Sequence, residues 1–311
     1  MHSETERIFR VLESYNANLP DVQKFWNNLF LWNSEEQGKF NIWKFLVSEG
    51  FVYSTVQSTK IDRAIQHWQD IESRGTPTAQ VKDCEYAPYW RERKDRVPSY
   101  VLEQRANVYQ ALAYFVKQNL QNPEVYVLYD TSYTDYNFEV YIILGQTLDR
   151  DWLCLIPTVP VQVEFQDTGS LDVNVEALTS CKSKNSNTQD LFEKINKILA
   201  RLEPIIIYGY YYGGYNYTYK HRILCTTSSN QIKAIKLGLK ASGMFAVDKS
   251  LSEMISYPKG EQVRQLMQET LEGCRRYTIS FWESGYAYDL GYTQTGDWLG
   301  FKHRFWCEYN P

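Results

Sequence analysis

The sequence predicts an α+β fold in which antiparallel sheets are flanked by helices, as in an α/β/α sandwich, and which has two related halves. The first observation is a repeated pattern, G-x-T-x-x-x-D-W-L-x-[LF], at residues 145–155 and again at 291–301. Each copy reads as a β-hairpin, with an apolar run, a polar turn and a second apolar run opened by Asp-Trp. The second observation is that a helix-like run ending in Leu precedes each hairpin, at residues 108–120 and 262–271. A helix followed by a hairpin, found twice, indicates helices packed on antiparallel sheets.

Within the repeated pattern, we expect Asp151 and Asp297 to cap the turns. Trp152, Trp298 and the alternate apolar residues that follow them should face a core. An alternative interpretation is that the two carboxylates serve acid–base chemistry, but their position before Trp at a turn favours capping. The run 191–202, with a Tyr six residues past its last Leu, looks like a third and weaker copy without the Asp-Trp-Leu signature.

Composition limits the possible functions. The 311 residues are enough for two domains or one large one. The net charge of −4 gives no sequence-wide attraction to phosphate, which argues against general nucleic-acid binding. Aromatic residues make up 15%, with 25 Tyr and 9 Trp, which supply core volume or contact surface. The charged N-terminus and the lack of a long apolar run predict a cytoplasmic protein with reduced thiols.

The N-terminal part reads as largely helical. Helical spacing of apolar residues predicts helices over residues 4–18, from Asp21 through Phe30, over 42–47 and over 58–73. Ser48-Glu49-Gly50 ends the third of these, and a strand-like run, 51–53, follows. We assign 1–45 as an N-terminal helical segment and 46–180 as a first α/β domain.

Residues 74–98 are the least patterned part of the first half. They contain three prolines and the charge cluster Arg91-Glu92-Arg93-Lys94-Asp95-Arg96, which Trp90 and Tyr100 flank. One interpretation is a solvated loop of mixed charge, and the other is a basic patch that faces a partner.

The second half begins after a polar stretch. Residues 161–165 and 171–175 alternate like half-buried strands, and 181–187, CKSKNSN, marks the domain boundary. The second, diverged α/β domain is therefore 188–311. It contains a helix over 191–202 and another over 230–243, which ends at a glycine suited to a C-cap.

A tyrosine-rich hairpin lies between these two helices. Residues 208–219 carry Gly213-Gly214, a natural turn, and Tyr215, Tyr217 and Tyr219 share a face beyond it. The functional interpretation is an exposed tyrosine surface that makes contacts at low entropic cost. The alternative is a sheet face packed under a helix.

The sequence predicts no catalytic residue, no metal site and no cofactor. It lacks a glycine-rich phosphate loop and the G-x-S-x-G, H-E-x-x-H and EF-hand patterns. None of its six cysteines forms a C-x-x-C pair. An acid–base site would use His221 or His303, each next to an arginine that would lower its pKa, but structural histidines are more common.

One stretch of the sequence resembles a known protein family. Asn119-Leu-Gln-Asn-Pro-Glu-Val-Tyr126, then Phe138-Glu-Val-Tyr-Ile142, Gly145-Gln-Thr147 and Asp151-Trp152-Leu153, resembles the C-terminal half of the nuclease A inhibitor-like proteins. The resemblance covers residues 46–158, is clearest over 108–158, and has a diverged second match at 262–305. It implies an α/β/α sandwich that plugs the active site of a sugar-nonspecific nuclease. It also implies that Glu49, in a Ser-Glu motif, approaches the nuclease metal. The chain departs from the family in continuing for about 150 residues past the first copy.

The sequence therefore predicts a non-enzymatic protein that binds another protein, for which a nuclease is one candidate. The alternative is a nucleic-acid-associated module in which the hairpin aromatics stack on bases and the basic cluster meets phosphates. The candidate partner-binding residues are Glu49, Trp90, Arg91, Arg93, Tyr211, Tyr215, Tyr217 and Tyr219.

Overall fold

The structure, a computed structural model, describes residues 2–17, 27–55, 60–73, 75–77, 97–130, 139–159, 175–211, 215–248, 251, 260–281 and 284–306. The chain divides into two compact units. Unit 1 draws on the described residues up to Phe45, on Phe245–Ser280 and on Ser284–Trp306. Unit 2 draws on those from Leu46 to Met244, with Phe281. Both units combine antiparallel sheets with helices, so the predicted α+β class is confirmed.

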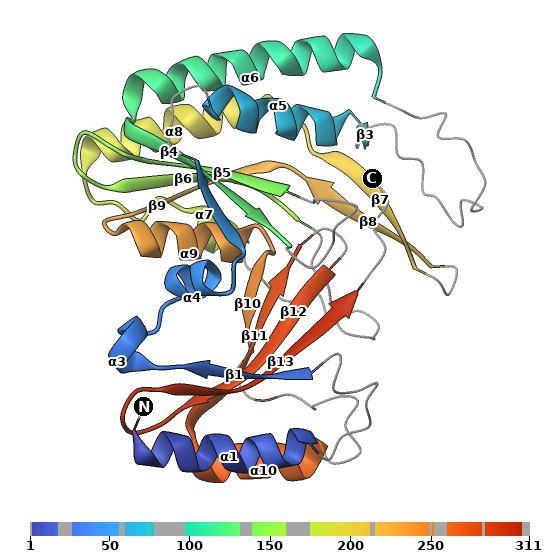
Figure 1. Cartoon of the computed structure of the whole chain (residues 1–311). Coiled ribbons are helices and arrows are strands. Elements are labelled where there is room, and N and C mark those ends of the chain that lie inside the picture. Colours follow the sequence, from blue (N-terminus) through green and yellow to red (C-terminus); the bar gives the residue numbers. More distant parts are fainter. Residues whose placement is uncertain are drawn as a thin grey trace. The chain divides into compact units, whose positions relative to one another are not determined.

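Unit 1 is built on a five-stranded sheet with the order β1-β13-β12-β11-β10, all antiparallel. The strands are β1 (Asn27–Trp32), β13 (Trp298–Trp306), β12 (Ser284–Tyr292), β11 (Glu272–Ser280) and β10 (Phe245–Val247). The helices are α1 (Ser3–Ala17), α3 (Ser34–Gln37), α4 (Ile42–Ser48), which begins in this unit, and α10 (Gly260–Thr270). Figure 1 shows α1 and α10 side by side against one face of this sheet.

Hydrophobic residues on both faces hold the layers of unit 1 together. On one face Ile8 and Leu12, one helical turn apart on α1, share a buried cluster with Met267 of α10 and with Phe301 of the sheet. On the other face the ring of Phe45 in α4 lies edge-on to Tyr288, with ring centroids 4.7 Å apart. Burial on both faces makes this a three-layer arrangement.

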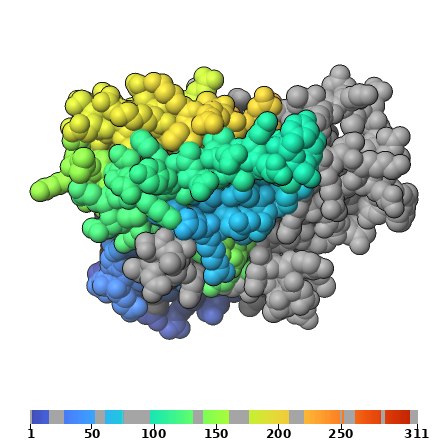
Figure 2. Space-filling view, turned by 90° about the horizontal axis from the view of Figure 1, so that it is seen from above, coloured from blue at the N-terminus to red at the C-terminus, as the bar shows by residue number. Residues whose placement is uncertain are grey.

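Unit 2 is built on a second five-stranded antiparallel sheet, with the order β2-β4-β5-β6-β9. The strands are β2 (Val52–Thr55), β4 (Gln121–Tyr129), β5 (Glu139–Gln146), β6 (Trp152–Pro157) and β9 (Ile223–Ser228). The helices are α5 (Lys60–Glu72), α6 (Ser99–Asn119), α7 (Val175–Thr179), α8 (Ser186–Leu199) and α9 (Gln231–Ala241). In Figure 2 the long α6 runs between α5 and α8 as an outer helical layer.

The core of unit 2 lies between that helical layer and its sheet. Trp68 of α5 and Leu112 of α6 are fully buried there, and the indole of Trp68 donates to the backbone oxygen of Tyr141, 3.1 Å away. On the opposite face α9 packs on β6 and β9. Gly238 allows this close approach, because a Cβ there would lie 3.1 Å from the sulfur of Cys154.

A smaller sheet, β3-β7-β8, also belongs to unit 2. Its strands are β3 (Thr76–Pro77), β7 (Ile205–Tyr211) and β8 (Tyr215–His221). The tyrosine-rich hairpin predicted from the sequence is therefore present. Among the described residues, no helix is both long enough and apolar enough to cross a membrane.

One sequence prediction is wrong. The helix expected from Asp21 through Phe30 is a strand in its described part, since β1 begins at Asn27 and pairs along its whole length with β13. Leu29 and Phe30 fit one face of a helix, but in a strand they point to opposite faces, and both faces of this sheet are covered. The third, weak copy has the predicted layout, since α8 is followed by the β7–β8 hairpin, but its strands belong to the small sheet.

The two copies of the repeated pattern, in contrast, form the same hairpin. Gly145 pairs with Leu153, and Gly291 pairs with Leu299, so the registers match. The first turn is closed by a bond from the Thr147 backbone N–H to the Asp151 carbonyl oxygen at 2.8 Å. The second turn has the equivalent bond, from Thr293 to Asp297, also at 2.8 Å. The two hairpins are therefore alike in structure as well as in sequence.

Candidate functional site

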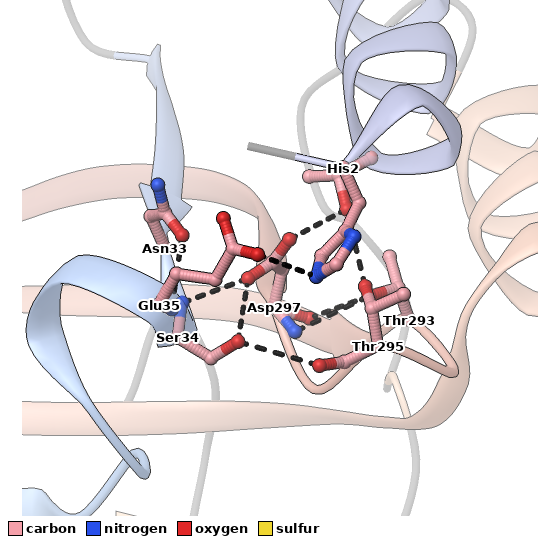
Figure 3. Close-up of polar contacts among 8 residues, drawn as sticks. His2, Asn33, Ser34, Glu35, Thr293, Thr295 and Asp297 are labelled. Carbon is pink, nitrogen blue, oxygen red and sulfur yellow. Dashed lines mark hydrogen bonds and ion pairs between the residues drawn. The ribbon is translucent and has the colours of Figure 1, made fainter.

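Asp297, the aspartate of the second Asp-Trp pair, forms the centre of a polar cluster in unit 1 (Figure 3). One carboxylate oxygen accepts from the Thr5 hydroxyl of α1 at 2.6 Å. The other accepts from the backbone N–H and the hydroxyl of Ser34, at 2.7 and 2.8 Å. Ser34 opens α3, directly after β1 and Asn33. One buried carboxylate thus joins the β12–β13 turn to α1 and to the end of β1.

The ionised form of Asp297 is favoured in the folded protein. Burial by itself would raise the pKa of this carboxyl, but the hydrogen bonds from Thr5 and Ser34 outweigh it and hold the pKa below its ordinary value. At the rim of the same cluster His2 lies 3.1 Å from Glu35, and both side chains are partly exposed. The arrangement is that of a hydrogen-bonded structural anion.

Asp151, the first copy, performs the same task in unit 2 with different partners. Its carboxylate accepts from the hydroxyl of Ser183 and, at 2.9 Å, from the side-chain amide of Asn185. Both donors lie just before α8. Thr188, inside the first turn of α8, bonds to Thr147 of the hairpin turn, with 2.8 Å between the hydroxyls. The turns themselves are closed by backbone hydrogen bonds. The two carboxylates have a further role, because each also binds a neighbouring helix.

The sequence contains a signal for these helices that the hairpin repeat alone does not reveal. The N-terminal turns of α1 and α8 follow a common pattern, S-x-T-x-x-[IL]-F-x-x-[IL]. Its members are Ser3, Thr5, Ile8, Phe9 and Leu12 in the first copy and Ser186, Thr188, Leu191, Phe192 and Ile195 in the second. Thr5 and Thr188 are both fully buried at the hairpin turns. This pattern extends the duplication from the hairpins to α1 and α8.

Replacing Asp297 by alanine is expected to lower the free energy of unfolding by about 2–3 kcal/mol, because the Thr5 hydroxyl and the Ser34 N–H then lack an acceptor in a buried position. Chemical denaturation monitored by tryptophan fluorescence measures the loss. The matched control is Glu35→Ala, which removes an exposed carboxylate from the same cluster. Equal effects of the two substitutions would contradict the role given to Asp297.

A second polar cluster lies within the sheet of unit 1. Arg276 of β11 donates to both carboxylate oxygens of Asp289 on β12, with both distances 2.8 Å, and the Nε2 of His303 on β13 lies 3.1 Å from the same carboxylate. All three side chains are buried. Burial would raise the pKa of Asp289, but Arg276 and His303 outweigh it and keep the pKa below its usual range.

Unit 2 shows that this fold does not require the charged cluster. In the equivalent register positions it has Val125 on β4, Ile143 on β5 and Pro157 on β6. These residues are apolar and make part of the ordinary sheet. The cluster of Arg276, Asp289 and His303 is therefore a feature of unit 1 alone among the two copies.

The histidines considered for acid–base chemistry have different surroundings. His221, at the end of β8, is fully buried, and its pKa falls to about 3, first because of burial and then because of the nearby charges of Arg105 and His67. The cation expected to lower it, Arg222, is not among the causes. His303 lies against Asp289, as described above. His221 is thus neutral at pH 7 inside the core of unit 2, where it has no access to solvent.

The β7–β8 ribbon contains four of the eight candidate partner-binding residues. Its register sets Tyr211 opposite Tyr215, Gly209 opposite Tyr217 and Ile207 opposite Tyr219. Directly opposed residues of an antiparallel pair share a face of the sheet. The four candidate tyrosines therefore belong to one face of the ribbon, which we call the tyrosine face. Their side chains lie outside the described residues.

The base of the ribbon is fixed in unit 2. Ile205–Ile207 are buried, and β7 passes so close to Gly75 that a Cβ on that glycine would collide with Ile205 and Ile207. On the other strand at the same end, Thr158 donates its hydroxyl to the Lys220 carbonyl oxygen at 2.9 Å and its backbone N–H to the Arg222 carbonyl oxygen, also at 2.9 Å. The ribbon is consequently anchored at both strands.

The other candidates are only partly covered by the structure. Glu49 follows α4 in a half-exposed turn that ends at Gly50. Trp90, Arg91 and Arg93 lie outside the described residues. Comparisons of the chain with family models, with curated proteins and with solved structures gave no match.

Proposed function

We propose that this protein binds another protein without catalysing a reaction, and that the tyrosine face of the β7–β8 ribbon is its contact surface. The register that assigns Tyr211, Tyr215, Tyr217 and Tyr219 to one face carries this proposal. Tyrosine supplies a large, rigid and amphipathic contact with only two side-chain torsions to order. Tyrosine is also enriched at the centres of protein–protein interfaces.

The anchoring of the ribbon supports the same function. Because Ile205–Ile207 are buried and Thr158 bonds to Lys220 and Arg222, both strands of the ribbon are fixed at their base before a partner arrives. A preorganised surface pays less entropy on binding than a flexible loop. The net charge of −4 favours a protein over a nucleic acid as the partner.

A sugar-nonspecific nuclease is the first target to test, because the stretch 108–158 resembles inhibitors of such enzymes. That stretch forms α6 and the β4–β5–β6 part of the unit 2 sheet, which has helices on both faces. The fold therefore agrees with the sandwich that the resemblance implies. Glu49, carried over from the Ser-Glu motif, is the residue proposed to approach the metal of the nuclease.

The test compares two double variants of the ribbon. In Tyr211→Ser/Tyr217→Ser the substitutions lie on the tyrosine face, and in Tyr208→Ser/Tyr210→Ser they lie on the other face, opposite Asn216 and Thr218. Each variant is assayed for inhibition of a magnesium-loaded sugar-nonspecific nuclease and for capture of proteins from native lysate, with and without prior nuclease treatment of the lysate. We expect the first variant to lose at least tenfold in affinity and the second to bind like the wild type.

Three outcomes decide the matter. Equal loss in both variants would indicate that the ribbon acts through folding and would overturn the assigned face. Capture that disappears when the lysate is treated with nuclease would favour the nucleic-acid alternative. A captured protein that is not a nuclease would keep the binding function and remove Glu49 from its proposed role.

A further inference from the structure

The elements of the two repeats follow each other in the same order. The first repeat runs α1, β1, α4, β2, α6, β4, β5, β6, and the second runs α8, β9, α9, β10, α10, β11, β12, β13. Each therefore has a leading α-β-α segment and a trailing β-α-β-β-β segment. The helices α3, α5 and α7 and the strands β3, β7 and β8 are additions to this scheme.

The trailing segments match in detail beyond the hairpin turn. In each, a helix ends at a leucine, Leu120 or Leu271, whose Cβ packs against a glycine of the following hairpin. A Cβ on Gly145 would lie 2.8 Å from that of Leu120, and a Cβ on Gly291 would lie 2.7 Å from that of Leu271. The strand after the helix also has an irregularity at the same place, between Gln121 and Glu124 in β4 and between 272 and 275 in β11.

The passage from the leading to the trailing segment matches as well. A glycine with positive φ follows the helix in both copies, Gly50 with φ 77° and Gly243 with φ 83°. The strand that follows then pairs antiparallel with the first strand of a hairpin, β2 with β4 and β10 with β11. The chain passes from unit 1 to unit 2 between Phe45 and Leu46, within the helix that Gly50 follows, and returns between Met244 and Phe245, directly after Gly243.

The edge strands reveal an exchange between the repeats. Strand β1 of the first repeat pairs with β13 of the second, where Leu31 lies opposite Leu299. Strand β9 of the second repeat pairs with β6 of the first, where Thr227 lies opposite Leu153. Since Leu153 and Leu299 are equivalent residues, the two edge strands fill the same place in the two sheets.

The helices follow their strands. The helix α1 is bonded through Thr5 to the β12–β13 turn, and α8 is bonded through Thr188 to the β5–β6 turn. Each helix thus joins the hairpin of the other repeat. On the opposite faces α4 packs on Tyr288 of β12 through Phe45, whereas α9 packs on β6.

We propose that the chain is a fused pair of repeats that have exchanged their leading α-β-α segments, so that neither repeat alone is a folding unit. The partner that the surface of each trailing segment fits is the leading segment of the other repeat, which in an unfused ancestor would be a second copy of the same chain. Exchange of identical elements between copies is an established route to dimers. Fusion makes the exchange intramolecular and therefore favours it through effective concentration.

The proposal is tested on the full chain by engineered disulfides. The pair Asn28→Cys/Lys302→Cys joins directly opposed residues of β1 and β13, whose Cα atoms are neighbours in the sheet. The control pair Asn28→Cys/Ile156→Cys joins β1 to the equivalent position of β6, where β1 would lie if the repeats had not exchanged. The intact protein is oxidised and then digested, and the linked peptides are identified by mass spectrometry. Exchange predicts near-complete linkage of the first pair and less than about one-tenth of that for the control.

A second measurement covers the case in which a cysteine perturbs folding. A protease site is inserted after Asp167, between the repeats, and the otherwise native protein is cleaved after folding. Each unit contains segments of both fragments, so we expect the cleaved protein to elute as one species at the 36.6 kDa of the intact chain. The fragments should separate only in denaturant and in step with unfolding. Linkage of the control pair, or separation into two folded fragments without denaturant, would overturn the exchange.

Discussion

Replacement of Asp289 by alanine is expected to lower the free energy of unfolding of unit 1 by about 3–5 kcal/mol. Arg276 and His303 would stay buried, but the Asp289 carboxylate that both of them contact would be gone. Denaturant unfolding measures the loss, and hydrogen exchange should place it in β11, β12 and β13. The matched control is Glu6→Ala in α1, which removes an exposed i,i+4 ion pair with Arg10 in the same unit and should have a far smaller effect.

The same cluster predicts the pH dependence of stability. Because the folded pKa of Asp289 lies below its unfolded value, the carboxylate contributes stability that is fully present above the unfolded pKa of about 3.9. This contribution is lost as the pH falls from there through the folded pKa. The wild type should therefore lose stability over that range more steeply than Asp289→Ala. Parallel acid limbs for the two proteins would contradict the assignment.

A triple variant separates folding from any other role of the cluster. Arg276→Val and Asp289→Ile install residues that unit 2 has at the equivalent positions, and His303→Val removes the third polar group. Replacing a complete buried ion cluster with apolar residues of similar volume is often neutral or stabilising. We expect the triple variant to recover at least half of the stability lost in Asp289→Ala. Such recovery would indicate that unit 1 has its charged cluster for a purpose other than stability.

Replacement of Glu72 by alanine should have a comparable effect in unit 2, about 3–5 kcal/mol. Glu72, at the end of α5, is almost fully buried and accepts from both Arg105 and Tyr109 of α6. Burial raises the pKa of Tyr109 well above its ordinary value, and Glu72 adds to the shift, so the phenol remains a donor. Without Glu72, the Arg105 charge would remain buried with the Glu203 carbonyl as its other acceptor, 2.7 Å away.

The control for Glu72 lies on the same pair of helices. Asp62 of α5 also accepts from a cation of α6, Lys117 at 2.6 Å, but it is 60% exposed. Asp62→Ala should change the unfolding free energy by less than about 1 kcal/mol, because solvent screens an exposed pair. Thermal unfolding of the three proteins provides the comparison. Similar losses for Glu72→Ala and Asp62→Ala would mean that burial does not set the strength of these pairs.

Local sequence patterns predicted the elements well where the period and the turn chemistry were unambiguous. The helix near 4–18 is α1, the helix near 58–73 is α5, and the two Asp-Trp hairpins have the same register. The helix predicted at 108–120 begins earlier, at Ser99. Its first turns were not predicted because Tyr100 and other exposed residues obscure the apolar pattern there. Each of these features depends on contacts between residues close in the chain, which a single sequence records.

The candidate site was predictable only in part. The alternation of Tyr215, Tyr217 and Tyr219 was visible in the sequence, but the pairing with Tyr211 required the strand register. The cluster of Arg276, Asp289 and His303 could not be predicted, because its members lie on three different strands. The sequence of one strand does not show which residues of another strand lie beside it. The hydrogen bonds from the hydroxyls of Thr5 and Thr188 to the hairpin turns could not be predicted either, because they also join segments that are far apart in the sequence.

The sequence by itself determined the class of the fold, its internal duplication and the local shape of each hairpin, since these follow from hydrophobic period, glycine placement and turn residues. Only the tertiary structure decided that 27–32 is a strand and that β1 and β9 complete the sheets of the opposite repeats. The physical reason is that both edge positions accept the same kind of apolar strand. The choice between them depends on how the chain continues after Gly50 and Gly243, and no local pattern encodes it.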